Sequence, residues 1–335
     1  MKGKKSLAII ILLAIAICSF GFQGMALAEK KPIEIKAGHV VPRGFTYDVG
    51  LEKFKDIVEK ETKGAIKVKI FPQGQLGSER ELIEGVMTGT IHMAVVNSAP
   101  CTGFIPQIGV FSLPYLFTSD EHAFRTLDGP IGAEILAKFD KIGIKAFSYW
   151  DGAKRGLVLP KKAIVKPEDL AGLKVRCMED PVMLEIFKSV KAIPTPIAWA
   201  EVYTALQQGT VDAVETSIPM MALNRFYEVG KHLTFSNHYW TPAPHIVNLK
   251  FFAKLPKQYQ DIFVKASNVG RDVCRQDVMP GGAHSYDKML QIMEKNGVAI
   301  AKIDMNLWRE TFKKTWKKFY PQYGEAYINK IASGK

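Results

Sequence analysis

The sequence lacks the short motifs that mark many enzyme active sites. It contains no G-x-S-x-G, no H-E-x-x-H, no Walker A loop and no G-x-G-x-x-G. Its seven histidines show no metal-ligand spacing. We therefore expect neither a metal site nor a cofactor. An acid–base pair whose members are far apart in the chain would leave no such motif, so an enzyme remains an alternative.

A membrane-spanning run is also missing after residue 28. Before it stand Lys2, Lys4 and Lys5, an apolar run over residues 7–18, and small residues at 26–28. This pattern predicts a signal peptide over residues 1–28, cleavage near Ala28 and export to the periplasm of a Gram-negative bacterium. A membrane anchor is the alternative, but the run is shorter than the roughly 20 residues that a span requires. With the export signal and no catalytic motif, we favour a binding protein over an enzyme.

Cysteine is scarce, and positive charge is spread out. Beyond the signal segment stand Cys101, Cys177 and Cys274, which we expect as buried thiols, with one disulfide pair left open. The net charge is +12, and subtracting three signal lysines leaves +9 for the rest. No dense basic block occurs. We therefore favour a solvated surface with a preference for anions, and consider a nucleic-acid-binding surface the weaker hypothesis.

Strand-like and helix-like patterns alternate along the chain. Alternating or continuous apolar residues predict strands at 33–37, 66–71, 91–96, 173–177 and 211–215. Helical spacing predicts helices at 49–63, 79–88, 181–191, 201–208, 257–276, 285–295 and 307–320, with a break at 279–282. Two helix–Gly–Thr–strand segments start 120 residues apart, at Glu81 and Glu201. The order predicts an α/β fold with two similar lobes.

Two arginines stand beside predicted strands of the second lobe. Arg176 follows the predicted strand residues 173–175, and Arg155 lies in a turn-like stretch before residues 157–159. Small ligands of α/β proteins bind at strand ends, and the planar arginine fork matches a carboxylate. A surface ion pair is the alternative for each arginine.

Several long motifs resemble one family. They are F-P-Q-G-Q-L-G-S-E-R-E-L-I-E from Phe71, G-L-K-V-R-C-M-E from Gly172, I-P-T-P-I-A-W-A-E-V-Y-T-A-L-Q-Q-G-T-V-D-A-V-E from Ile193, and N-R-F-Y-E-V-G-K-H-L-T-F-S-N-H from Asn224. They resemble the substrate-binding subunit of tripartite ATP-independent periplasmic (TRAP) transporters, in an order that covers nearly the whole mature chain.

The resemblance implies a periplasmic binding protein fold. Two discontinuous α/β lobes, joined by hinge strands and bridged by a C-terminal helix, would close over a ligand. We place lobe I at 29–152 and 242–281, and lobe II at 153–241 and 282–335. The expected ligand is a small organic acid: a C4-dicarboxylate, sugar acid, 2-oxo acid or aromatic acid. The expected protein partners are the small and large membrane subunits, and we expect a monomer. An ABC-type binding protein for an anion and a periplasmic enzyme acting on an organic acid remain alternatives.

The resemblance also implies roles for individual residues. Arg176 would bind the carboxylate, Arg155 would be a second arginine of the site, and Trp199 would place its ring against the ligand, with core packing as its alternative. Thr216 stands where relatives often have Asn, and offers one donor rather than two. The other residues expected around the cleft are His39, Glu79, Asn97, Trp150, Glu179 and His238.

Overall fold

One mixed β-sheet runs through the computed structural model, which describes residues 31–159 and 162–334. The predicted signal peptide lies outside the described residues. Neighbouring strands follow the order β2-β1-β3-β9-β4-β7-β5-β6, while β8 pairs with β4 and β10 with β8. Apart from Ile33, these strands belong to one structural unit, residues 34–335. Their bounds are β1 Ile33–Gly38, β2 Ile66–Phe71, β3 Met93–Val95, β4 Ile144–Leu159, β5 Lys174–Cys177, β6 Ile193–Pro196, β7 Ala213–Ser217, β8 His232–Thr234, β9 Trp240–Asn248 and β10 Ala299–Ile300.

Strand β4 joins two halves of this sheet. It pairs antiparallel with β9 from Ile144 to Lys154, and antiparallel with β7 from Arg155 to Val158. In the first half β1 is parallel to β3, and in the second half β5 is parallel to β6 and β7. Parallel neighbours need long crossover connections, which are usually helical. The predicted two-lobed α/β fold is therefore confirmed, whereas the lobe boundaries stay a prediction.

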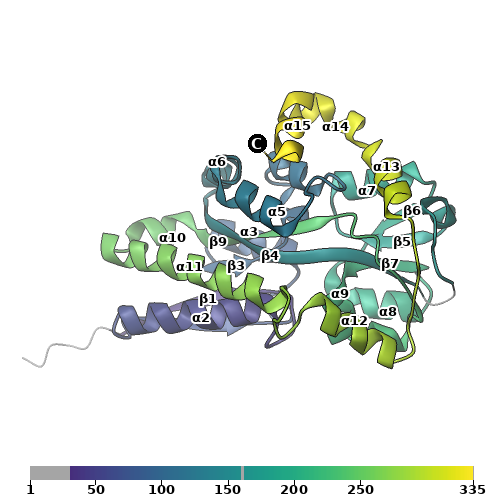
Figure 1. Ribbon diagram of the computed structural model, residues 1–335. Coiled ribbons are helices and arrows are strands. Elements are labelled where there is room, and N and C mark those ends of the chain that lie inside the picture. Colours follow the sequence, from purple (N-terminus) through teal and green to yellow (C-terminus); the bar gives the residue numbers. More distant parts are fainter. Residues whose placement is uncertain (1–30, 160–161, 335) are drawn as a thin grey trace, which may run out of the picture. The chain divides into compact units, whose positions relative to one another are not determined.

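Helices pack around both halves of the sheet. In Figure 1, α2 and α11 run side by side next to the first half, and α12 lies against α9 beside the second half. Toward the C-terminus, α13 contacts residues 167–170 and α14 contacts residues 106–112. The helix bounds are α2 Thr46–Glu61, α3 Glu79–Thr88, α4 Ser98–Cys101, α5 Asp120–Asp128, α6 Pro130–Ala137, α7 Pro181–Ser189, α8 Val202–Gln207, α9 Ile218–Leu223, α10 Leu249–Lys254, α11 Lys257–Val278, α12 Tyr286–Lys295, α13 Met305–Lys313, α14 Trp316–Tyr323 and α15 Glu325–Ser333.

The helix starts that the sequence predicted are formed by side-chain caps. The hydroxyl of Ser78 accepts from the Glu81 amide, and Glu81 Oε2 accepts from the Ser78 amide at 2.7 Å, so α3 begins with a capping box. Helix α7 begins after Asp180, whose carboxylate accepts from the amides of Val182 and Met183. The predicted break after α11 is also present, because α12 starts only at Tyr286.

The two helix–Gly–Thr–strand segments are built alike. Gly89 and Gly209 both have positive φ, at 84° and 73°. Two residues after each glycine, the amide of Ile91 donates a hydrogen bond to the carbonyl of Gly85, and the amide of Val211 donates one to the carbonyl of Ala205. Because these residues still close the helix, the predicted strands at 91–96 and 211–215 begin later, at β3 and β7.

The prediction of one continuous helix over residues 307–320 is wrong, because two helices occupy this range. Helix α13 ends at Lys313 and α14 begins at Trp316. Between them both the amide and the hydroxyl of Thr315 bond to the carbonyl of Phe312, at 3.0 and 2.7 Å, which tightens the turn.

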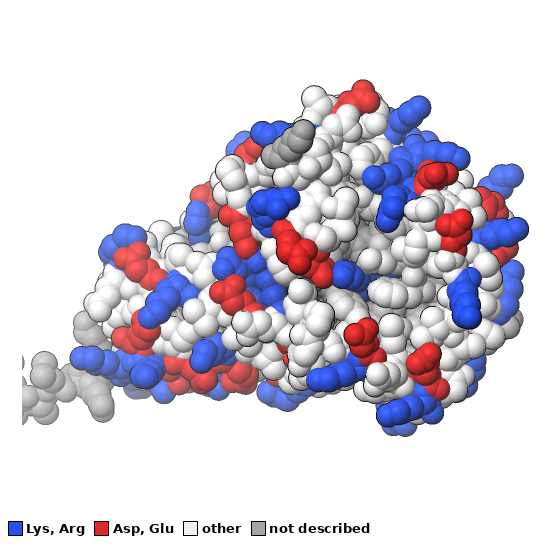
Figure 2. All heavy atoms as spheres, in the orientation of Figure 1, with Lys and Arg blue, Asp and Glu red and all other residues white. Residues whose placement is uncertain are grey.

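The cysteines and the surface charges follow the sequence reading. Cys101, Cys177 and Cys274 are buried, as predicted, and Cys101 and Cys177 are free thiols. On the face drawn in Figure 2, acidic side chains lie among the basic ones over much of the surface.

Candidate functional site

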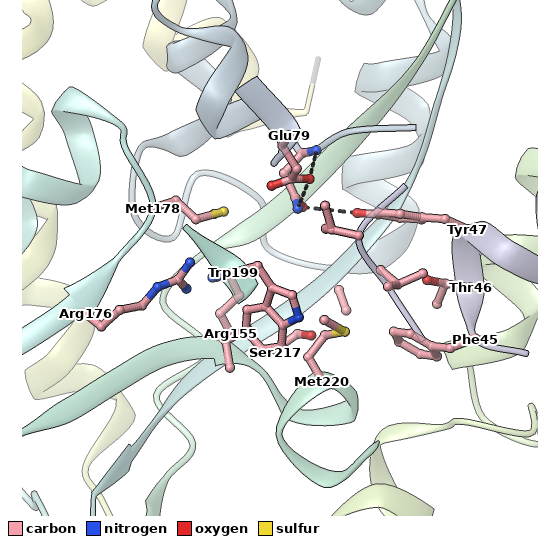
Figure 3. A pocket seen from close by; sticks show the side chains of 15 residues that line it. Phe45, Thr46, Tyr47, Glu79, Arg155, Arg176, Met178, Trp199, Ser217 and Met220 are labelled. Atoms are coloured by element: carbon pink, nitrogen blue, oxygen red, sulfur yellow. Dashed lines mark hydrogen bonds between the residues drawn. The ribbon is translucent and has the colours of Figure 1, made fainter. Parts of the chain in front are cut away.

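Strand ends from both halves of the sheet meet around one cavity. It encloses about 460 Å³ of empty space, part of which is open to solvent. The first half contributes the stretch after β1, the start of α3, and Asn97, which lies two residues after β3. The second half contributes residues of β4, β5 and β7. The lining residues, most of them labelled in Figure 3, are Val40, Val41, Phe45, Thr46, Tyr47, Glu79, Asn97, Ala153, Arg155, Arg176, Met178, Trp199, Thr216, Ser217 and Met220.

Arg155 is held by a buried carboxylate on the neighbouring strand. The register places it opposite Ser217, and its Nε and Nη2 donate to the two carboxylate oxygens of Glu215, the second at 2.8 Å. Arg155 is 3% exposed and Glu215 is 0% exposed. Burial would lower the pKa of Arg155, but the Glu215 carboxylate outweighs this and keeps it above its ordinary value. Arg155 is therefore a charge that the protein already balances.

Arg176, on β5, is a buried cation with a different set of partners. Its Nε and Nη2 donate to the carbonyl of Ile197, and its Nη1 donates to the carbonyl of Glu215 at 3.1 Å. Within the described chain, no carboxylate lies within 4 Å of its guanidinium. Burial, and after it the positive charge of Arg155, lowers the pKa of Arg176 to about 10. A buried charge without a counter-ion is costly, so the site favours an anion.

The guanidinium of Arg176 has donors left for that anion. Arginine carries five N–H groups, and the three bonds above use three of them. One N–H on each of Nη1 and Nη2 then remains without an acceptor in the described part of the chain, and such a pair matches the two oxygens of a carboxylate. The ring of Trp199 lies 5.6 Å from the guanidinium carbon and forms a wall of the cavity.

Glu79 places a carboxylate on the other side of the cavity. The backbone amide and the side-chain amide of Asn97 both donate to its Oε1 at 2.7 Å. The side-chain oxygen of Asn97 in turn accepts from the Tyr47 hydroxyl at 3.1 Å. Burial raises the pKa of Glu79 above its ordinary value, against the lowering effect of the Asn97 bonds and the two arginines. Figure 3 shows this chain of contacts above Arg155 and Trp199.

Six of the ten expected site residues thus line this cavity: Arg155, Arg176, Glu79, Asn97, Trp199 and Thr216. The other four lie elsewhere. His39 is buried, and its Nε2 lies 3.1 Å from a carboxylate oxygen of Asp48. Trp150 is buried where α2 meets α11, so close to Gly50 that a Cβ there would lie 2.4 Å from the ring.

His238 and Glu179 are also outside the lining. His238 lies behind Glu215, with its Nε2 3.8 Å from Glu215 Oε1 and its Nδ1 2.7 Å from the Ser236 hydroxyl. Glu179 has a side chain that is 67% exposed and pairs with Arg80 at 3.4 Å. It faces an adjoining hollow that shares Glu79 and Arg176 with the cavity, so it lies beside the site rather than in it.

The sequence reading missed several residues of the site. Phe45, Thr46 and Tyr47 line the cavity from the turn after β1 and the start of α2. The rule that ligands bind after parallel strands was the signal that could have found them. Glu215 belongs to the predicted strand at 211–215, and burial of an acidic residue in an apolar strand points to a partner of opposite charge.

The lining offers binding groups but no metal centre. Within residues 31–159 and 162–334, no group of three or more His, Cys, Asp or Glu side chains is arranged to hold a metal ion. In the same residues no helix combines the length and apolarity that a membrane crossing needs.

Comparisons with known proteins agree with this geometry. The family model described as "Bacterial extracellular solute-binding protein, family 7" matches residues 37–322. A solute-binding protein of Verminephrobacter eiseniae is 36% identical over 287 residues, which are 86% of this chain and 85% of that protein. A TRAP periplasmic solute-binding protein from Polaromonas sp. JS666, bound to D-erythronate, is 31% identical with a TM-score of 0.85, covering 90% of this chain and 98% of the other. One from Sulfurospirillum deleyianum, with bound succinate, is 30% identical with a TM-score of 0.85, covering 90% and 99%.

Proposed function

Since this chain belongs to the bacterial extracellular solute-binding proteins of family 7, the TRAP solute-binding proteins, we propose that it captures a small organic acid in the cavity between its two half-sheets. Arg176 binds the carboxylate of this acid, and Arg155 adds positive charge beside it. The loaded protein delivers the acid to the two membrane subunits of a TRAP transporter.

The main support for this proposal is that Arg176 is buried and keeps hydrogen-bond donors that no described residue accepts. It is 3% exposed, has two N–H groups without a protein acceptor, and lacks a carboxylate partner among the described residues. A carboxylate satisfies both the charge and the donors at once. Similar proteins with bound D-erythronate and succinate agree with an acid as ligand.

The protein binds its acid and releases it unchanged. The family consists of solute-binding proteins, and the cavity presents a cation, an acceptor and apolar walls rather than a nucleophile next to a general base. A 24-hour incubation with the bound acid, followed by mass spectrometry, tests this. Recovery of the intact acid is expected, and a stoichiometric excess of product would contradict the proposal.

A panel of acids tests the binding function. Purified protein is heated with and without D-erythronate, succinate, D-galactonate, adipate, pyruvate and benzoate. An acid at 100 times its dissociation constant adds about 2.7 kcal/mol to the free energy of unfolding and raises the melting temperature. Calorimetric titration of the acid that gives the largest shift then gives its affinity. Absence of binding to every acid would contradict the proposed function.

Export is the second part of the proposal. The pattern of residues 1–28 and the periplasmic location of TRAP solute-binding proteins support it. Expression of the full chain in a Gram-negative host should yield periplasmic protein whose intact mass lacks residues 1–28. Full-length protein in the membrane fraction of these cells would instead support a membrane anchor.

A further inference from the structure

We propose that the ligand carries a single carboxylate and several hydroxyl groups, and that Glu79 selects it against dicarboxylates. This inference rests on the proposed function, because it assumes that Arg176 binds one carboxylate of the ligand. It assigns the part of the cavity that is formed by Glu79 and Asn97.

The positive charges of the cavity lie together at one end. Arg155 Nη2 and Arg176 Nη1 donate to the same oxygen, the carbonyl of Glu215, at 3.3 and 3.1 Å. The two guanidinium groups are therefore neighbours. The carboxylate of Glu215 already pairs with Arg155, so Arg176 is the guanidinium that still has donors for a ligand carboxylate.

The part of the cavity formed by Glu79 and Asn97 offers a hydrogen-bond acceptor instead of a cation. Both Asn97 donors go to Glu79 Oε1, and no described residue donates a hydrogen bond to Oε2. An ionised carboxylate accepts hydrogen bonds and donates none, so its natural ligand partner is a hydroxyl group. These bonds orient the Glu79 carboxylate, which is 9% exposed.

Nothing else in the described lining balances a second carboxylate. Arg155 and Arg176 are the cations among the lining residues. Apart from the carboxylate of Glu79, the other polar side chains of the lining carry hydroxyl and amide groups, including those of Thr46, Thr216 and Ser217. A dicarboxylate bound to Arg176 would place its second carboxylate near Glu79 in a partly desolvated space, where like charges repel strongly. A polyhydroxy monoacid would instead donate to Glu79 and contact the hydroxyl groups.

Two matched pairs of acids test this. D-erythronate and succinate have four carbons each, and D-galactonate and adipate have six. The first member of each pair is a polyhydroxy monoacid and the second is a dicarboxylate. Calorimetric titration at pH 7.5 should show that the protein binds the hydroxylated member of at least one pair ten or more times more tightly than the dicarboxylate.

The substitution Glu79→Gln assigns that preference to its carboxylate. The amide keeps an oxygen for Asn97 but turns a donor toward the cavity and removes the negative charge. We expect weaker binding of the hydroxylated acid, tighter binding of the dicarboxylate, and a shift of their affinity ratio by at least tenfold. Glu84→Gln is the control, because it makes the same change on the same helix at an exposed side chain. It should leave the ratio unchanged.

The outcomes separate this inference from the proposed function. Tighter binding of the dicarboxylate by the unaltered protein, or an unchanged ratio in Glu79→Gln, would overturn the inference while leaving an acid-binding protein. Failure to bind any acid of the panel would overturn the proposed function and the inference with it. A melting temperature measured for each variant without ligand confirms that the proteins compared are folded.

Discussion

Removal of the charge of Glu215 should destabilise the empty protein strongly. Glu215 balances Arg155 through two hydrogen bonds in a place where both side chains are at most 4% exposed. Glu215→Gln leaves Arg155 as an uncompensated buried cation next to Arg176. Breaking a buried pair in this way costs roughly 3–5 kcal/mol, a large part of the 5–15 kcal/mol that stabilises a typical domain.

Urea unfolding at pH 7, followed by circular dichroism, measures this cost. The double variant Arg155→Met with Glu215→Met should be less destabilised than Glu215→Gln, because it removes both charges together. Glu34→Gln is the control for an exposed pair, since Glu34 and its partner Lys69 are each 57% exposed, and it should change stability far less. A loss below about 1 kcal/mol in Glu215→Gln would refute the view that Arg155 depends on this carboxylate.

Two further predictions concern the first half of the protein and its core. Burial lowers the pKa of His245 to about 3, whereas an unfolded histidine titrates near 6.5. The unfolded chain therefore binds more protons than the folded protein, so His245 lowers the free energy of unfolding as the pH drops from 7 to 4.5. Urea unfolding of His245→Gln should show a smaller fall over this pH range. A fall equal to that of the unaltered protein would contradict this prediction. Gly50→Ala places a Cβ 2.4 Å from the Trp150 ring, so it should cost about 1–3 kcal/mol in the same assay. Gly103→Ala, whose new Cβ would meet nothing nearer than 3.9 Å, should cost much less, and equal costs would refute the steric argument.

Much of the fold could be predicted because local signals determine it. The capping box at Ser78, the cap at Asp180 and the glycines at 89 and 209 act within a few residues of the chain, and the helices start or end there. The strand starts after the two glycines were misplaced by two residues. Whether an amide bonds back to a helix or across to a strand depends on geometry that an apolar pattern does not contain.

The site was partly predictable for the same reason. Arg176 and Asn97 follow or end parallel strands, where the α/β fold places ligands. The family resemblance implies that His39, Trp150 and His238 surround the cleft, but all three side chains are buried in the interior, beside Asp48, Gly50 and Ser236.

Side-chain direction at these positions is decided by packing between distant segments. Trp150 illustrates this, because its ring fills the space left by glycines on two helices that are 220 residues apart, Gly50 and Gly270. No sequence pattern around Trp150 predicts that contact.

Arg176 is the residue on which the account depends most. Arg176→Ala would leave the ligand carboxylate partly desolvated and without its fork of donors, which costs roughly 2–5 kcal/mol, or about thirtyfold to several thousandfold in affinity. Arg176→Lys should recover only part of this, because an ammonium group does not match two oxygens. Arg309→Ala removes an arginine that lies outside the cavity, over the ring of Tyr115, and serves as the control.

Calorimetric titration of these three variants with the acid that the unaltered protein binds best, together with their melting temperatures, is the most direct measurement. Arg176→Ala should lose at least thirtyfold in affinity and keep its melting temperature without ligand, while Arg309→Ala should keep its affinity. Unchanged affinity in Arg176→Ala, with a lowered melting temperature, would show that Arg176 serves the fold instead of the ligand.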